Sequence, residues 1–168
     1  MNAVVSNSTP LIYLAKAGRL DLLEKLFGTV LIPEEVKVEV VDKGKALGEK
    51  DAYVIEKAID EGWLKVQSVK VVEVPMKLHE GEVAALSLAK SMGLVVLLDE
   101  VSARTAARLI GVSPRGTVFV LLSALEEKLV SFDECIETLN KLIVEGFRLK
   151  EEVYIETVKE ARRIAAAT

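Results

Sequence analysis

Oxygen-bearing side chains follow two apolar segments of the sequence, at positions where a β-strand would end. Asn7 and Ser8 follow the apolar segment 3–5, and Asp99 follows the apolar segment 94–98. In open α/β sheets, ligands bind beyond the carboxyl ends of the strands. Asp99 considered alone would most simply cap the helix that follows it, because Asp is a frequent helix cap. A third acidic residue makes a functional interpretation stronger.

That residue is Glu82, which falls on the apolar side of a helix predicted over residues 79–92. Ala85, Leu86 and Ala89 lie three, four and seven positions later, on the same helical face. A carboxylate on an apolar face is costly unless a cation or a metal ion pairs with it. The structural alternative is a buried salt bridge or an interaction with the helix N-terminus, since Glu82 lies in the first turn.

Glu39 is a fourth candidate, and its pattern is weaker. It sits at the edge of an apolar stripe formed by Val36 and Val40, while Glu35 and Asp42 lie further toward solvent. The spacing alone does not choose between Glu39 and Glu35.

The composition limits the kind of ion that these residues could bind. Cys135 is the only cysteine and His79 is the only histidine, so neither a cysteine-based zinc site nor a histidine-rich site can form. Any ion must therefore be held by oxygen, which indicates Mg²⁺ or Mn²⁺. The net charge of −4 argues against a protein that coats nucleic acid, but it is compatible with a small basic groove.

Strands and helices alternate in the predicted order of elements. Strands are expected at 3–5, 30–32, 64–66 and 94–98. Helices are expected at about 9–26, 33–42, 49–61, 79–92, 100–110, 117–128, 131–144 and 150–166. The first helix is expected to be capped by Thr9, with Pro10 at its first helical position and a break near Gly18. A loop is expected at 44–48 and a turn at 114–116. This alternation predicts an α/β fold with a mostly parallel sheet and helices on both faces.

A single domain is expected over residues 1–168, with an acid-cluster core at about 1–130 and a helical extension at about 131–168. The length suffices for one sizeable core and is too short for two ordinary domains. No apolar run approaches the roughly 20 residues that a membrane-spanning helix needs, so we expect a cytoplasmic protein. Apolar positions of the last helix, among them Val153 and Ile155, predict packing against a partner, and we expect a homodimer.

Three segments of the sequence resemble PIN domains. The segment 4–12, VVSNSTPLI, is similar to the opening strand and turn of that family. The segment 79–86, HEGEVAAL, resembles the central acidic helix of an uncharacterised PIN-like branch related to toxin ribonucleases of the VapC type. The segment 98–104, LDEVSAR, followed by Gly116 and Thr117, resembles the later block of the same branch. The order and spacing of the three segments, over roughly the first 130 residues, make the resemblance specific.

This resemblance implies a three-layer α/β/α sandwich with an acid cluster that binds one or two Mg²⁺ or Mn²⁺ ions. Asn7, Glu39, Glu82 and Asp99 occupy the acidic positions of the family pattern, with the three carboxylates as catalytic groups. The family usually has Asp where this chain has Asn7. An amide oxygen can still coordinate Mg²⁺, but it contributes no negative charge.

The resemblance also implies an endoribonuclease that hydrolyses single-stranded RNA, as the toxin of a toxin–antitoxin pair with a protein antitoxin as partner. Two metal ions about 3.5–4 Å apart would generate the attacking water and stabilise the leaving oxygen. Ser8, Arg104, Arg108 and Thr117 are the candidates for substrate binding, although the arginines fit an ordinary surface role equally well. Two other functions remain open: a metal-poor RNA- or protein-binding module, and a phosphoryl-accepting domain that uses Asp99.

Overall fold

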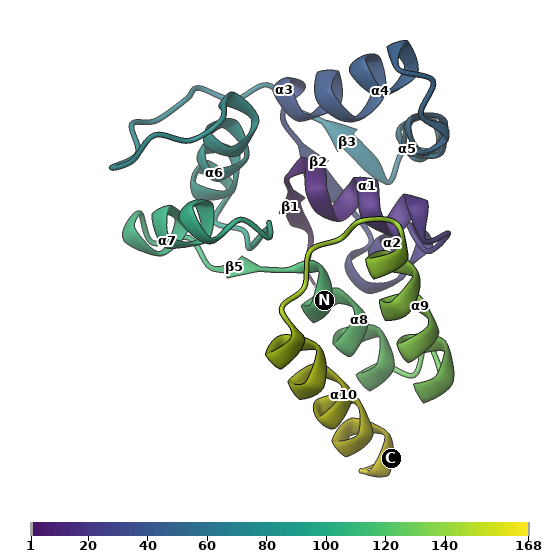
Figure 1. The fold of residues 1–168 in the computed structure, drawn as a ribbon. Helices are drawn as coiled ribbons and strands as arrows, with labels where there is room; N and C mark the ends of the chain where they lie inside the picture. The colour runs from purple at the N-terminus through teal and green to yellow at the C-terminus, as the bar shows by residue number, and fades with distance from the viewer. Residues whose placement is uncertain (1, 168) are drawn as a thin grey trace.

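The sheet of the computed structural model, which describes residues 2–167, contains five parallel strands within that range (Figure 1). The strands are β1 (Val4–Ser6), β2 (Val30–Ile32), β3 (Leu64–Val66), β4 (Val96–Leu97) and β5 (Pro114–Arg115), in the spatial order β3-β2-β1-β4-β5. β1 is the central strand, because Val5 is aligned with Leu31 on one side and with Val96 on the other. The predicted parallel sheet is confirmed.

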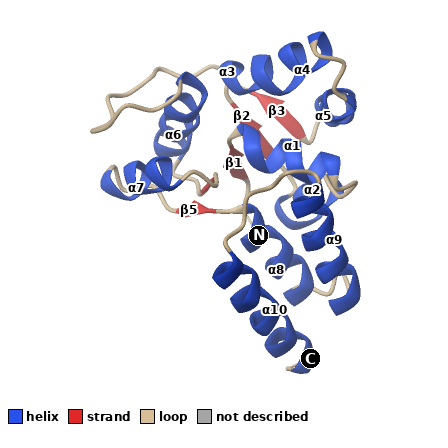
Figure 2. Ribbon diagram, viewed as in Figure 1, coloured by secondary structure: helices blue, strands red, loops and turns tan. Residues whose placement is uncertain are grey.

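Helices connect the strands and cover the sheet (Figure 2). They are α1 (Ser8–Lys16), α2 (Asp21–Phe27), α3 (Glu34–Lys37), the π-helix η1 (Val38–Lys43), α4 (Gly44–Ala46), α5 (Lys50–Glu61), α6 (Glu80–Met92), α7 (Val101–Leu109), α8 (Thr117–Glu126), α9 (Phe132–Val144) and α10 (Glu151–Ala166). Both α6 and α7 lie on one side of the strands, and α1, α2, α8 and α9 lie on the other.

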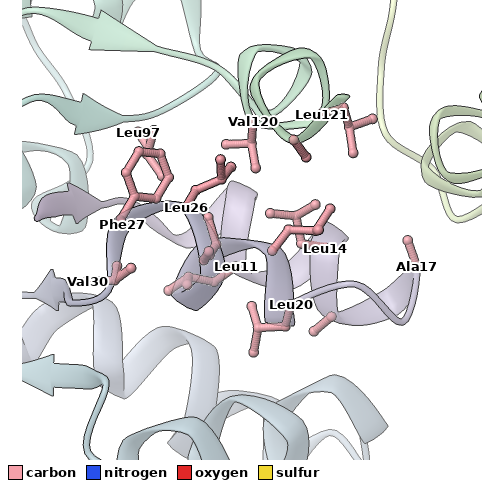
Figure 3. Packing of buried hydrophobic residues seen from close by; sticks show 14 of the residues in the cluster. Leu11, Leu14, Ala17, Leu20, Leu26, Phe27, Val30, Leu97, Val120 and Leu121 are labelled. Carbon is pink, nitrogen blue, oxygen red and sulfur yellow. The ribbon is translucent and has the colours of Figure 1, made fainter. Parts of the chain in front are cut away.

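Each face of the sheet has its own hydrophobic core, because successive strand residues point to opposite faces. Val4 and Val30 belong to the core that includes α1, α2 and α8, whereas Val5 and Leu31 belong to the core formed with α6 and α7. Figure 3 shows the first core, in which leucines of α1 and α2 lie near Val120 of α8. Burial of each such side chain stabilises the fold by about 1.5–3 kcal/mol. The predicted three-layer α/β/α sandwich is thereby confirmed.

The start of α1 differs from the prediction. Asn7, and not Thr9, is the residue before the first helical position, with extended backbone angles of φ −82° and ψ 179°. Pro10 therefore occupies the third helical position. This position tolerates proline because the first four N–H groups of a helix have no partner within the helix.

Two further segments differ from the prediction because tertiary packing decides them. Gly44–Ala46, predicted as part of a loop, is helical, and a Cβ on Gly44 would lie only 2.8 Å from the Cβ of Ala52 in α5. The glycine therefore allows α4 to continue close against α5. The predicted turn at 114–116 contains β5, whose carbonyl at Arg115 accepts a 2.8 Å hydrogen bond from the N–H of Leu98. Pro114 is tolerated there because β5 is an edge strand.

The C-terminal helices pack against α1 and α8. A capping box opens α9, with the Glu134 N–H donating to Ser131 Oγ at 3.1 Å. The Tyr13 and Phe147 rings meet edge to face at 5.5 Å, which ties the end of α9 to α1. None of the helices within residues 2–167 is long and apolar enough to cross a membrane.

We predict that Phe147→Ala lowers the free energy of unfolding by about 3 kcal/mol, because it removes a buried ring that packs against the helix carrying the candidate site. Chemical denaturation would measure this change. Tyr13→Phe is the control, since it keeps the ring contact and loses only a long 3.5 Å hydrogen bond to the Gly146 carbonyl. A Phe147→Ala protein as stable as the wild type would show that the C-terminal helices do not support α1.

Candidate functional site

A cleft of about 700 Å³ lies beyond the carboxyl ends of β1, β2 and β4. Its walls come from η1 and from the first turns of α1, α3 and α6, together with the residue that precedes α7; Figure 1 shows α3 and α6 at this end of the sheet. The lining residues are Asn7, Ser8, Thr9, Glu34, Glu35, Val38, Glu39, Lys43, His79, Glu80, Gly81, Glu82 and Glu100. The cleft is therefore located where parallel α/β sheets bind their ligands.

Negative charge dominates the lining of the cleft. Six glutamates line it, and Lys43 is its lysine. Each helix N-terminus carries a partial positive charge of roughly half an elementary charge, so the converging helices offset part of this repulsion. The remaining negative charge favours a bound cation.

Two oxygens meet at the first turn of α6. A Cβ on Gly81 would lie 3.3 Å from Glu39 Oε2 and 3.9 Å from Asn7 Oδ1. The absence of a side chain at Gly81 thus leaves room for both groups. The Asn7 side chain makes no capping hydrogen bond to α1, and Glu39 belongs to a π-helical turn, a geometry often found at functional sites.

Glu82 is buried, with 6% of its surface exposed, as its position on an apolar helical face predicts. Its Oε1 accepts a 3.1 Å hydrogen bond from the backbone N–H of His79. This interaction with the helix N-terminus is the structural alternative to metal binding that the sequence offered at Glu82. The bond occupies one carboxylate oxygen and fixes the orientation of a side chain that also lines the cleft.

Ser8 supplies an independent sign of a ligand. Its Oγ is the only buried side-chain nitrogen or oxygen in the described part of the chain that has no hydrogen-bond partner, and the residue is 3% exposed. An unpaired buried hydroxyl costs about 1–3 kcal/mol. Because Ser8 lines the cleft, a ligand there could satisfy this hydroxyl.

Asp99 does not line the cleft, and each of its carboxylate oxygens accepts a hydrogen bond. The Thr117 backbone N–H donates to Oδ1 at 2.8 Å, and the Thr117 hydroxyl donates to Oδ2 at 2.7 Å. Burial raises the pKa of the Asp99 carboxyl, while the Thr117 hydrogen bonds and the nearby Arg104 oppose that rise. A Cβ on Gly116 would lie 2.8 Å from Asp99 Oδ1, so the glycine permits this approach. Asp99 therefore caps α8.

The structure brings some predicted site residues together and separates others. Asn7, Ser8, Glu39 and Glu82 share the cleft. The other four predicted residues, Asp99, Arg104, Arg108 and Thr117, are not among its lining residues. Arg104 lies beside Asp99 near Gly116, Arg108 is exposed on α7, and Thr117 is buried under Asp99.

Several lining residues are not among the predicted site residues, and Glu100, Gly81 and Lys43 are examples. Asp99 and Glu100 both follow the same strand, and the sequence interpretation assigned only Asp99 to the site. Gly81 could have been noticed as a glycine in the first turn of a helix, where close approach of another group is one explanation. The sequence provided no indication that Lys43 belongs to the cleft, because no neighbouring residue distinguishes it from an ordinary surface lysine.

The residues present fit an oxygen-bound divalent cation. Within residues 2–167, no group of three or more His, Cys, Asp or Glu side chains is arranged to hold a metal ion. Mg²⁺, however, keeps several of its own waters and needs only one or two carboxylates. Glu39 and Glu82 could supply these carboxylates, and Asn7 an amide oxygen.

Comparison with known proteins identifies a matching family and similar solved structures. Residues 3–163 match the model of a family described as a PIN domain, DUF3368. A PilT N-terminus domain protein from the hyperthermophilic archaeon Sulfolobus solfataricus P2 has a similar structure, with a TM-score of 0.54 and 19% identity over 75% of this chain and 95% of that chain. At this identity, the structural likeness shows the fold alone. No curated protein matches the sequence.

We predict that Gly81→Ala weakens Mn²⁺ binding about tenfold, because the added methyl group displaces the Glu39 carboxylate. Stability should not fall, since alanine favours a helix over glycine by up to about 1 kcal/mol. Calorimetric titration with Mn²⁺ and thermal unfolding would measure the two effects. Ser91→Ala, on the exposed far end of α6, is the control. Unchanged affinity in a folded Gly81→Ala protein would mean that Glu39 does not bind the ion.

Proposed function

The chain belongs to the PIN-domain family, and on this premise we propose that it is a divalent-metal-dependent endoribonuclease that hydrolyses phosphodiester bonds of single-stranded RNA. The PIN domain is generally a nuclease fold. The observation that carries the proposal is the cleft itself, where Asn7, Glu39 and Glu82 meet beside the unpaired Ser8 hydroxyl.

Glu39 and Glu82 would hold the Mg²⁺ or Mn²⁺ ion, with the Asn7 amide oxygen as a neutral third ligand. A bound ion supplies an activated water near neutral pH and stabilises negative charge on the leaving oxygen. The hydrogen bond from His79 to Glu82 keeps that carboxylate in place before the ion arrives. The Glu39 carboxylate keeps its place because Gly81 has no side chain that would displace it.

The phosphate groups of the substrate meet several donors at the same cleft. Lys43 lines the cleft, and its ammonium group can pair with a phosphate oxygen. The Ser8 hydroxyl can donate a hydrogen bond, and the N-termini of α1 and α6 carry a partial positive charge that favours an anion. Arg108 is exposed on α7 outside the cleft, so we assign it at most a contact with RNA beyond the reacting phosphate.

We extend the proposal to the biological setting that the sequence resemblance implies, a cytoplasmic toxin held by a protein antitoxin. We also propose a homodimer that buries the exposed apolar residues of α10. Val153 and Ile155 of this helix have 43% and 48% of their surface exposed. Val158, another apolar residue of that helix, packs against the core of its own chain.

A second candidate function is a catalytically weak module that binds RNA or protein. The observation that favours it is Asn7, whose amide leaves the central strand without the negative ligand that the family usually has there.

We predict that Glu39→Gln and Glu82→Gln each reduce Mn²⁺-dependent RNA cleavage by about 100-fold or more, because each removes one anionic ligand. Glutamine at position 82 keeps an oxygen that can accept the His79 N–H, so the fold should survive. Cleavage of a labelled single-stranded RNA would be measured, with Glu127→Gln on the exposed end of α8 as the control. Full activity in both variants would refute the proposed site.

We predict that Asn7→Asp tightens Mn²⁺ binding by a few kcal/mol at most, because it adds one Coulombic partner at intermediate dielectric. In a working nuclease the substitution should raise cleavage mainly at low Mn²⁺ concentration. In a binding module, the natural protein should be inactive at every concentration, and the substitution could switch cleavage on. Cleavage titrated against Mn²⁺ for both proteins separates the two functions. No change in affinity or cleavage would place Asn7 outside the ion site.

A further inference from the structure

One wall of the cleft is the π-helical turn η1, and the spacing of its lining residues fits that geometry. Val38 and Lys43 both line the cleft, although they lie five positions apart. Residues at this spacing point about 140° away from each other in an α-helix, because each residue turns the helix by about 100°. The π-helix repeats from i to i+5, so such residues lie nearly above each other. The π-helical turn therefore keeps Val38, Glu39 and Lys43 together on the side that lines the cleft.

An ion pair on the same turn has the same spacing. Lys37 Nζ lies 3.0 Å from Asp42 Oδ1 and 3.2 Å from Asp42 Oδ2, five positions along the chain, and neither residue lines the cleft. Neighbours on an α-helix are three or four positions apart, whereas five positions match a π-helical turn. The ion pair therefore stabilises the π-helical register of η1 over the α-helical one.

The end of η1 is held by a close contact with α5. Gly44 follows the turn directly, and a Cβ at this position would lie 2.8 Å from the Cβ of the fully buried Ala52. The chain can approach α5 this closely only because residue 44 has no side chain. Neither Gly44 nor Ala52 lines the cleft, so this contact can act on the site only through η1.

The side chains that η1 turns toward the cleft are ones that the proposed site uses. Glu39 Oε2 would lie 3.3 Å from a Cβ on Gly81, so the carboxylate already reaches the first turn of α6 and follows any displacement of η1. Within the described residues, Lys43 has no carboxylate at ion-pair distance, whereas the neighbouring Lys37 and Lys45 are both paired. Lys43 is thus left available on the same face as Glu39.

From these contacts we propose that η1 is a positioning element of the site, whose π-helical register directs Glu39 toward the ion with Lys43 on the same face. Lys37, Asp42 and Gly44 are then positioning residues, which hold η1 in this register and do not touch the ion. This inference rests on the proposed function, because it concerns how two residues of that site are held.

The first test exchanges a methyl group between η1 and α5. Gly44→Ala should weaken Mn²⁺ binding about tenfold in calorimetric titration, because the added methyl group displaces η1 and Glu39 with it. Ala52→Gly alone should lower the melting temperature, since glycine weakens a helix, but should leave the affinity unchanged. Combined with Gly44→Ala, it should restore the affinity. A folded Gly44→Ala protein with normal affinity, or a double variant as weak as Gly44→Ala, would overturn the proposal.

The second test breaks the ion pair, and its expected result is opposite to that of simple charge removal. Lys37→Gln removes a positive charge, so electrostatics alone would tighten Mn²⁺ binding. Loss of the π-helical register should instead weaken binding about threefold, within the range of an exposed ion pair. Exchange of the two partners, Lys37→Asp with Asp42→Lys, should restore the affinity.

Lys45→Gln is the matched control for the second test. It removes the same charge from an ion pair outside η1, and the two lysine side chains have similar exposed fractions of 33% and 37%. Lys45→Gln should not weaken Mn²⁺ binding. Unchanged or tighter binding in Lys37→Gln, or equal losses in the two variants, would overturn the proposal.

The proposed function and this inference fail in distinguishable ways. If the unaltered protein binds no Mn²⁺, both are wrong. If it binds Mn²⁺ and Glu39→Gln weakens that binding, while Gly44→Ala and Lys37→Gln do not, only the role of η1 is wrong.

Discussion

Negative charge concentrates at one end of the sheet, and the other features of the site follow from how that charge is held. Parallel strands end there and helices begin there, so carboxylates from separate parts of the chain meet in one cleft. Like charges at such distances repel each other unless dipoles, hydrogen bonds or a cation offset them. The fold supplies the first two: helix N-termini surround the cleft, and Glu82 is held by the His79 N–H. Lys43 offsets only one of the six glutamate charges, so the cleft favours a further cation.

The sheet gives this arrangement its rigidity. β1 has a neighbour on each side and a core on each face, so the start of α1 is fixed from four directions. Asn7 and Ser8 follow β1 directly and inherit that constraint. The cores are built from branched aliphatic side chains, whose close packing transmits small shifts. A site at the centre of the sheet is consequently more constrained than one built from loops.

Sequence reasoning succeeded where the signal is local and periodic. The continuous apolar runs predicted the buried strands, and the position of Glu82 three, four and seven residues before apolar side chains predicted its burial. It failed for β5, because two paired residues carry no periodicity, and for the cap of α1, because Asn7 and Thr9 are both good capping residues. The bond between Asp99 and Thr117 joins residues 18 positions apart through tertiary contact, so spacing alone could not show that Asp99 is engaged.

The same contrast explains why a family pattern can identify a site without assigning each residue of it. The Asp99 carboxylate at the end of β4 accepts two hydrogen bonds from Thr117 at the start of α8, one on each oxygen, and each oxygen keeps a further acceptor site. The two consecutive acids Asp99 and Glu100 lie in different places, because Asp99 accepts hydrogen bonds from Thr117 whereas Glu100 lines the cleft, and the family pattern alone does not show this difference.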